Sequence, residues 1–413
     1  MGLPRSVIRL VPALLAALLA ACATQTTPPW RAQQAGAPGS SETPAPGPAA
    51  AGGTPTVGLL LPLTGSSAKL GADFQDAAQM ALFDVGETSV RLVPRDTGDT
   101  PEGAVTAATA AMDAGATLLL GPLFGRSTTA VAPVAQARNV SVLSFSNDAS
   151  VAAPGVYILG FRPEEQVARI VDYAGKRGLS RFAALAPDDA YGNLALSAWR
   201  QAVGQLPGAS IIGAERYPTQ GGDPSAAVKR LVQNAASSPA RPPVPGGRPG
   251  NLPPFDSLMI ADSGPSLRAV VATLPLYNVA GGNTRLLGTM RWRDDPGLFA
   301  EQPVQGAWIA SWDPQTVDRF VERFRTTYGR VPAPLAVLAY DGTALACLLA
   351  KSDAGFGASQ LTDPQGFAGG SGLFRLRPDG LAEHGLAVLE VRNGSAGVID
   401  PAPKTFPAGA ASD

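Results

Sequence analysis

The side chains that enzymes use most often for catalysis are scarce in this chain. Its 413 residues include one histidine, His384, and two cysteines, Cys22 and Cys347. A zinc site built from several histidine or cysteine ligands is therefore excluded. A Ser-His-Asp triad would have to use His384, which lies in a glycine-rich turn, and the chain has no nucleophile-elbow motif.

Other catalytic motifs are missing as well. The sequence contains neither a GxGxxG fingerprint nor a P-loop. Asp188 and Asp189 are adjacent, so their carboxylates would point apart and make a poor acid–base pair. We therefore expect no metal site, no cofactor and no enzymatic activity.

Predicted strands and helices alternate along the chain. The strands are short apolar runs bounded by turn residues, and the helices place apolar residues on one face. The predicted strands are 57–61, 90–94, 117–120, 140–145, 182–186, 211–217, 257–261 and 285–287. The predicted helices are 74–85, 102–114, 128–138, one starting at Pro163, 194–203, 226–235 and 267–274. This alternation implies parallel sheets with helices on both faces, so we predict an α/β fold of two doubly wound lobes.

Length and composition agree with two α/β domains and disfavour nucleic acid as a partner. The length suffices for two domains, each with its own core. The formal net charge of −1 and the pI of about 6.0 offer no electrostatic attraction for a polyanion.

The N-terminus has the pattern of an export signal. Arg5 and Arg9 precede an apolar run from Leu10 to Ala21, which is shorter than the ~20 residues that a membrane-spanning helix needs. The run ends in Leu-Ala-Ala before Cys22 and resembles the lipobox of bacterial lipoproteins, which implies cleavage after residue 21 and lipidation of Cys22. Residue 23 is Ala rather than the Asp that signals inner-membrane retention in that family, so we expect a periplasmic protein anchored to the outer membrane.

Three segments have the composition of disorder. Residues 22–55 are rich in Pro, Ala, Gly, Ser and Thr and are predicted to be a flexible tether. Residues 238–254 are predicted to be a disordered insertion and residues 401–413 a disordered tail. Lipidation of Cys22 would leave Cys347 without a partner, so we expect a buried core thiol there.

Three stretches together carry a family pattern. The first is Val57 to Gly65, with its P-x-T-G loop; the others are Gly121 to Ser146 and Phe320 to Gly342, the last ending in Ala-Tyr-Asp-Gly. In this order they resemble the type I periplasmic binding proteins, specifically the leucine/isoleucine/valine-binding branch. The likeness spans about Thr56 to Ile399.

The resemblance implies two discontinuous lobes joined by a three-strand hinge. We place the three crossings near Gly160, near Thr289 to Trp292 and near Gly369 to Gly372. The predicted domains are 56–160 plus 290–368 for the N-terminal lobe, and 161–289 plus 369–400 for the C-terminal lobe.

Ligands of doubly wound sheets bind at the carboxyl ends of the strands, and hinged lobes close over them. Ser127 and Thr128 also begin a predicted helix, where free N–H groups favour an anion. The resemblance implies that Ser127, Thr128 and Ser146 bind a ligand carboxylate. It also implies that Tyr191 covers the ligand and that Asp262 faces an ammonium group. The complete set of predicted ligand-binding residues is Thr64, Ser127, Thr128, Ser144, Ser146, Tyr191 and Asp262.

Simpler roles remain open for these residues. Ser127 and Thr128 could only cap their helix, and Asp262 could be another N-cap. Arg126 and Phe145 depart from the family pattern. The long cation of Arg126 at the mouth of the cleft could bind an acidic ligand or block a small amino acid. Phe145 is larger than the residue usual in the family, so both departures disfavour an ordinary branched-chain amino acid as ligand.

Asp188 and Asp189 could likewise only cap the helix near Leu194. We expect Trp292 and Trp312 to pack at the hinge or within a lobe rather than to bind ligand.

Two functions fit this reading. The first is the solute-binding component of amino-acid or amide transport or sensing, which binds a small amino-acid-like ligand and serves an inner-membrane transporter. The second is suggested by two segments, the opening strand and loop from Leu59 to Gly65 and the turn Gly121-Pro122-Leu123. Both are similar to segments of the penicillin-binding-protein activators. Those outer-membrane lipoproteins act by contact with a peptidoglycan synthase, but the best-known type carries a helical-repeat domain that this chain lacks.

Overall fold

The computed structural model describes residues 53–86, 89–219, 222–235, 253–279, 282–352 and 355–407. The predicted signal peptide, Cys22 and nearly all of the predicted tether and insertion lie outside these residues. Residues 401–407 of the predicted tail are described, and there Phe406 is buried beneath the Arg375 guanidinium, 4.5 Å from the ring centroid. This part of the tail packs onto the fold because it carries a large apolar side chain.

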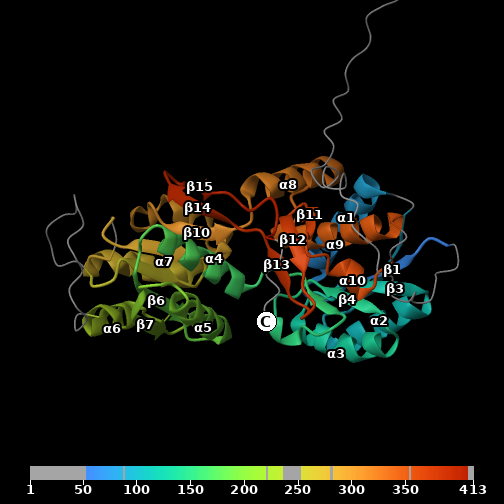
Figure 1. Cartoon of the computed structure of the whole chain (residues 1–413), viewed down its shortest axis with the longest axis horizontal. Coiled ribbons are helices and arrows are strands. Elements are labelled where there is room, and N and C mark those ends of the chain that lie inside the picture. The colour runs from blue at the N-terminus through green and yellow to red at the C-terminus, as the bar shows by residue number, and fades with distance from the viewer. Residues whose placement is uncertain are drawn as a thin grey trace, which may run out of the picture. The chain divides into compact units, whose positions relative to one another are not determined.

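The first sheet is parallel and has the strand order β2-β1-β3-β4-β5. Its strands β1, β3 and β4 are labelled at the right of Figure 1. Helices α2 and α3 pack over one face, where Leu60 and Leu119 meet a row of alanines. Helix α1 lies on the other face and contacts α9 from the C-terminal part of the chain. The elements are β1 Thr56–Leu61, α1 Ala68–Val85, β2 Arg91–Asp96, α2 Pro101–Asp113, β3 Ala116–Leu120, α3 Gly125–Ala137, β4 Ser141–Ser144 and β5 Val156–Ile158.

The second sheet has seven strands in the order β15-β14-β10-β9-β8-β6-β7. The five strands from β6 to β10 are parallel, and β14 and β15 are antiparallel additions at one edge. Helices α4 and α5 cover one face, and α6 and α7 cover the other. The elements are α4 Pro163–Lys176, β6 Arg181–Pro187, α5 Ala190–Gly204, β7 Ser210–Tyr217, α6 Ser225–Ala235, β8 Ser257–Ile260, α7 Gly264–Thr273, β9 Arg285–Gly288, β10 Trp308–Ser311, β14 Ala387–Arg392 and β15 Ser395–Asp400.

The remaining elements join the first lobe. Helix α9 packs on α1 and carries a small antiparallel sheet of three strands. The stretch Pro334–Lys351 is apolar and long enough to suit a membrane span, but it is mostly buried within the fold. Cys347 lies in this helix as a buried free thiol. The elements are α8 Pro314–Tyr328, α9 Val337–Lys351, α10 Ala358–Leu361, β11 Phe367–Gly369, β12 Gly372–Leu376 and β13 Ala382–His384.

The strand pairings place two of the three lobe crossings later in the chain than we predicted. Strand β10 pairs with β9 and β14, so the second crossing follows Ser311 rather than Thr289 to Trp292. Strands β11 to β13 stay with the first lobe, and the third crossing follows His384 rather than Gly369 to Gly372. The prediction missed β10 because an apolar run of four residues does not by itself distinguish a strand from other buried structure.

Local sequence explains where helices begin. Thr100 accepts a hydrogen bond from the Gly103 amide and Pro101 occupies the first turn of α2. Helix α5 is also capped by a side chain, because the Asp189 carboxylate accepts a hydrogen bond from the Gly192 amide. A Cβ added to Gly192 would lie 1.9 Å from the Pro187 carbonyl oxygen, so this turn leaves room for glycine alone.

We expect Gly192→Ala to lower the free energy of unfolding by about 1–3 kcal/mol, because the strand end and the helix must separate to admit a methyl group. Gly204→Ala, at the other end of α5, is the matched control: an added Cβ there meets no atom within 4 Å. This control should be neutral or stabilising by less than about 1 kcal/mol. Urea unfolding of the two variants measures both effects, and equal stabilities would contradict the packing argument.

Candidate functional site

The hydroxyls at the strand ends of the first lobe are bonded to one another. Thr128 and Ser144 are completely buried, and their oxygens lie 2.6 Å apart. They also hydrogen bond to the carbonyls of Phe124 and Pro122, at 3.1 and 3.0 Å. The Ser144 hydroxyl accepts from the Ser146 amide at 3.1 Å. These groups therefore tie the end of β4 to the start of α3 and are already satisfied.

The helix-capping alternative for Ser127 and Thr128 is wrong. The N-cap of α3 is Phe124, and both residues lie inside the first turn. Thr128 donates to the Phe124 carbonyl, which is a bond back along the helix and not a cap. Ser127 is buried on the same turn.

Thr64 lies in the loop after β1, where its partner is Asp96 at the end of β2. The Asp96 carboxylate accepts from the amides of Leu63, Thr64 and Gly98 at 2.8–3.2 Å, and from the Thr64 hydroxyl at 2.6 Å. Burial acts against ionisation, but the hydrogen bonds from Thr64 and the amides outweigh it and lower the pKa of Asp96. An internal carboxylate thus uses the amide donors of this loop.

A second internal carboxylate, that of Asp99, uses the hydrogen-bond donors at the start of α1. The Asp99 carboxylate accepts from the Ser67 amide at 2.9 Å and from the Ser66 hydroxyl at 3.0 Å. Arg126 reaches across and donates to the Asp99 carbonyl at 2.9 Å. The Asp148 carboxylate accepts from the amide and the hydroxyl of Ser150 at 3.0 and 2.6 Å. The strand-end edge of this lobe is therefore lined by its own carboxylates.

In the second lobe, Asp262 is a buried carboxylate at the end of β8. It accepts from the Tyr217 hydroxyl and from the Ser263 amide, both at 2.7 Å. Burial raises the pKa of Asp262, and the bonds from Tyr217 and Ser263 offset only part of this effect. The N-cap of α7 is Ser263, so the capping alternative for Asp262 is wrong.

Tyr191 lies beside this acid, at the start of α5. Its hydroxyl is 3.1 Å from the Thr289 hydroxyl. The Arg291 guanidinium stacks on its ring, with Cζ 4.3 Å from the centroid, and donates to the Ser263 hydroxyl at 2.7 Å. The structure therefore brings Tyr191 and Asp262 into one cluster, and adds Arg291, which the sequence did not suggest.

The two neighbouring aspartates have local roles. Asp189 caps α5, which agrees with the capping alternative, and accepts from the Gly192 amide at 2.8 Å. Asp188 does not cap the helix and instead forms an ion pair with Arg216 at 3.1 Å. Among the described residues no three His, Cys, Asp or Glu side chains gather as a metal site.

The hinge contains an aromatic contact in which Trp312 packs as expected, with two partners that the sequence did not indicate. Phe161 precedes α4, Trp312 follows β10, and His384 ends β13, so each crossing contributes one ring. The Phe161 ring lies 5.2 Å from Trp312 and 4.5 Å from His384 between centroids. We call these three residues and Glu165 the hinge cluster. Trp292, by contrast, is buried in the core of the second lobe and donates to the Ile260 carbonyl.

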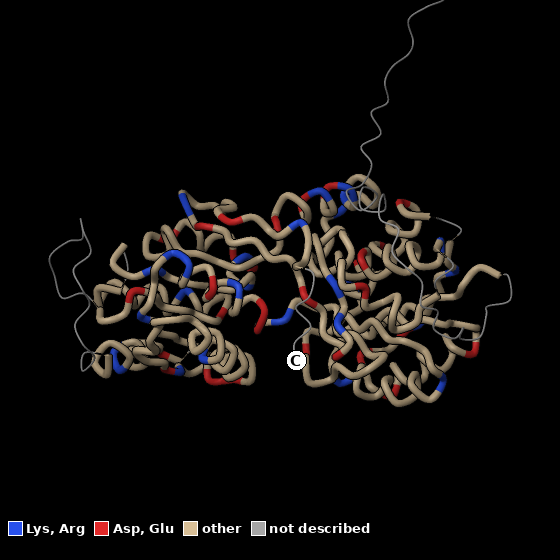
Figure 2. Tube along the Cα trace, in the orientation of Figure 1, with Lys and Arg blue, Asp and Glu red and all other residues tan. Residues whose placement is uncertain are grey.

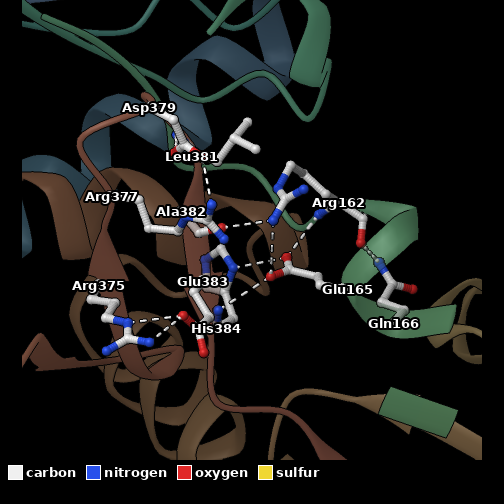
Figure 3. Close-up of polar contacts among 10 residues, drawn as sticks. All are labelled: Arg162, Glu165, Gln166, Arg375, Arg377, Asp379, Leu381, Ala382, Glu383 and His384. Carbon is white, nitrogen blue, oxygen red and sulfur yellow. Dashed lines mark hydrogen bonds and ion pairs between the residues drawn. The ribbon is translucent and has the colours of Figure 1, made fainter. Parts of the chain in front are cut away.

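Glu165 connects α4 to β13 in the hinge cluster (Figure 3). Its Oε1 lies 2.9 Å from His384 Nδ1, and its carboxylate accepts from the amides of Arg162 and His384 at 2.9 and 3.2 Å. Arg162 donates to the Ala382 carbonyl at 3.0 Å. Burial acts against ionisation of Glu165, but the contacts with His384 and Arg162 outweigh it and lower its pKa.

Comparison with known proteins identifies a family. Residues 54–396 match the model of a family described as periplasmic binding protein. A curated relative, an uncharacterized protein of Rickettsia prowazekii, is 29% identical over 136 residues; the match covers 33% of this chain and 36% of that protein. The chain thus spans about a third of the length of the curated relative that it matches.

Solved structures with the same fold are numerous but distant in sequence. A branched-chain amino acid ABC transporter periplasmic ligand-binding protein from Burkholderia xenovorans superposes with a TM-score of 0.66 at 16% identity, covering 85% of this chain and 96% of that one. An ABC transporter substrate-binding protein from Desulfitobacterium hafniense, in complex with Leu, gives 0.59 at 20%, with coverage of 84% and 99%. A solute-binding protein of an ABC transporter from R. palustris, in complex with benzoate, gives 0.56 at 18%, with coverage of 85% and 98%.

We expect Glu165→Gln to lower the free energy of unfolding at pH 7 by about 2 kcal/mol, because the ionised carboxylate accepts charge-assisted hydrogen bonds across the hinge. The pKa of Glu165 is lowered in the folded state, so this stabilisation is present above the ordinary value of 4.5 and is lost as the pH falls below it. Urea unfolding of wild type and variant should therefore converge toward acid pH.

Glu383→Gln is the matched control, since this neighbouring carboxylate points to Arg375 and is 36% exposed. Its effect should stay below about 1 kcal/mol. A Glu165→Gln protein as stable as wild type at pH 7 would contradict the assigned hinge contact.

Proposed function

Because the chain belongs to the periplasmic binding protein family, we propose that it is a non-enzymatic binding protein that holds a small amino-acid-like ligand between its two lobes. The observation that carries this proposal is the hinge. Three chain crossings meet in one cluster, and the parallel strands of the sheets on either side of it end in polar side chains. Two rigid sheets joined in this way can close over a ligand at the carboxyl ends of their strands.

The role that follows is delivery of a solute to an inner-membrane transporter, or sensing of that solute. Acidic and basic residues are interspersed along both lobes (Figure 2), in keeping with a small ligand rather than a polyanion. The predicted residues Thr64, Ser127 and Ser146, with Tyr191 and Asp262 opposite, stand as the proposed site.

We also propose that Cys22 is lipidated and tethers the protein in the periplasm, at the outer membrane. The support is the apolar run before Cys22 and Ala rather than Asp at residue 23.

One observation favours a second candidate function, that of a penicillin-binding-protein activator acting on a peptidoglycan synthase. Thr128 and Ser144 bond to each other and to the backbone, which removes two hydroxyls from a ligand site. An outer-membrane tether would also separate the protein from an inner-membrane permease.

The test of the first proposal is calorimetry on the full-length protein in detergent, with a panel of amino acids and aromatic carboxylates. We expect at least one compound to bind with a Kd below about 10 µM, and to stabilise the protein by about 2.7 kcal/mol at a hundred times that concentration. Asp262→Ala should weaken this binding at least tenfold. Asp188→Ala, the exposed neighbour paired with Arg216, should change it less than threefold.

If no compound of the panel binds, the solute-binding proposal is contradicted. If the immobilised protein then retained a purified peptidoglycan synthase, and stimulated its activity, the second function would replace the first.

The anchor has its own test. We expect Cys22→Ser to move the protein from the membrane fraction to the soluble periplasmic fraction, because the acyl chains supply the membrane affinity. Cys347→Ser is the matched control: this thiol is buried in α9, so the variant should remain in the membrane fraction. A Cys22→Ser protein that stays with the membrane would exclude lipid anchoring through this residue.

A further inference from the structure

The second lobe carries a cation at the point where its strand order reverses. Strands β8, β9 and β10 lie on one side of β6, and β7 lies on the other, so the reversal falls between β6 and β8. Loops diverge to opposite faces at such a point, and ligands of doubly wound sheets bind there. Tyr191 follows β6, Ser263 follows β8, and Arg291 follows β9.

The Arg291 guanidinium is held in a fixed plane. It stacks on the Tyr191 ring at 4.3 Å and donates to the Ser263 hydroxyl at 2.7 Å. Among the described residues no carboxylate lies within ion-pair distance of it. Asp262 and Asp294 interact with it only at longer range, and Asp262 already accepts from Tyr217 and from the Ser263 amide. A planar, preoriented guanidinium without a partner carboxylate suits a bidentate bond to a carboxylate group.

At the corresponding position the first lobe carries carboxylates in place of a cation. Its strand order reverses between β1 and β3, beside the loop after β1. The amides of Leu63, Thr64 and Ser67 in and after this loop are bonded to Asp96 and Asp99. A ligand carboxylate would have to displace these internal carboxylates and would be repelled by them.

Resting on the proposed function, we infer that the ligand is a small carboxylate and that Arg291 of the second lobe binds its carboxylate group. This reverses the orientation expected from the resemblance, in which Ser127, Thr128 and Ser146 take the carboxylate. Tyr191 then acts as the support that fixes the guanidinium, and the first lobe contacts the rest of the ligand.

The test compares each carboxylate with its uncharged amide, namely leucine with leucinamide and benzoate with benzamide, by calorimetry on the full-length protein. Wild type should bind at least one carboxylate more tightly than its amide. Arg291→Gln should raise the Kd of that carboxylate by about 10- to 100-fold, which corresponds to the loss of a charge-assisted hydrogen bond. The Kd of the amide should stay within about threefold of its wild-type value. Arg291→Lys keeps the charge but not the planar guanidinium, so its affinity for the carboxylate should lie between those of wild type and Arg291→Gln.

Two further variants make the assignment specific. Arg126→Gln removes the arginine at the strand ends of the first lobe, and Arg319→Gln removes an exposed arginine of α8 as a matched control. Thermal unfolding of every variant verifies that it folds. If Arg291→Gln binds the carboxylate as wild type does, or if Arg126→Gln is the variant that loses it, the inference is overturned and the proposed function stands. If wild type binds none of the four compounds and none of the wider panel, the proposed function fails and the inference falls with it.

Discussion

The contact of Phe161 with Trp312 and His384 is the constraint on which the arrangement of the lobes depends. Each ring comes from a different chain crossing, so one cluster joins three segments that are far apart in sequence. Aromatic pairs at these spacings contribute about 0.5–1.5 kcal/mol each beyond their burial. Glu165 adds directionality, because its carboxylate binds His384 from the first turn of α4. The only histidine of the chain is therefore part of the hinge.

The two lobes share a topology but differ in the electrostatics of their strand ends. In the first lobe, Asp96 and Asp99 occupy the amide donors of the loop after β1. In the second, the buried Asp262 accepts hydrogen bonds from Tyr217 and Ser263, and Arg291 stands over the Tyr191 ring. The same topology thus carries different charged side chains at its two sets of strand ends, and such side chains rather than the fold decide what a site can bind.

Much of the fold could be predicted because periodicity reports burial directly. The strand at 57–61 and the helix starting at Pro163 correspond to β1 and α4, since continuous apolar runs and punctuated amphipathic faces have few alternative structures. The second crossing could not be predicted, because the short run that forms β10 becomes a strand only by pairing with β9 and β14. The contacts of the predicted site residues could not be predicted for the same reason. The sequence around Thr128 does not show that its hydroxyl hydrogen bonds to that of Ser144.

By itself, the sequence determined the α/β class, the two-lobed family, the scarcity of catalytic groups and the position of the one cysteine suited to lipidation. Each of these follows from residue type, count or short-range spacing. The tertiary structure alone decided which side chains meet: His384 with Glu165 across 219 residues, and Arg291 with Tyr191 and Ser263 at three strand ends. The physical reason is that hydrogen bonds and stacking act over a few ångströms, and distant segments reach that range only when the sheets have formed.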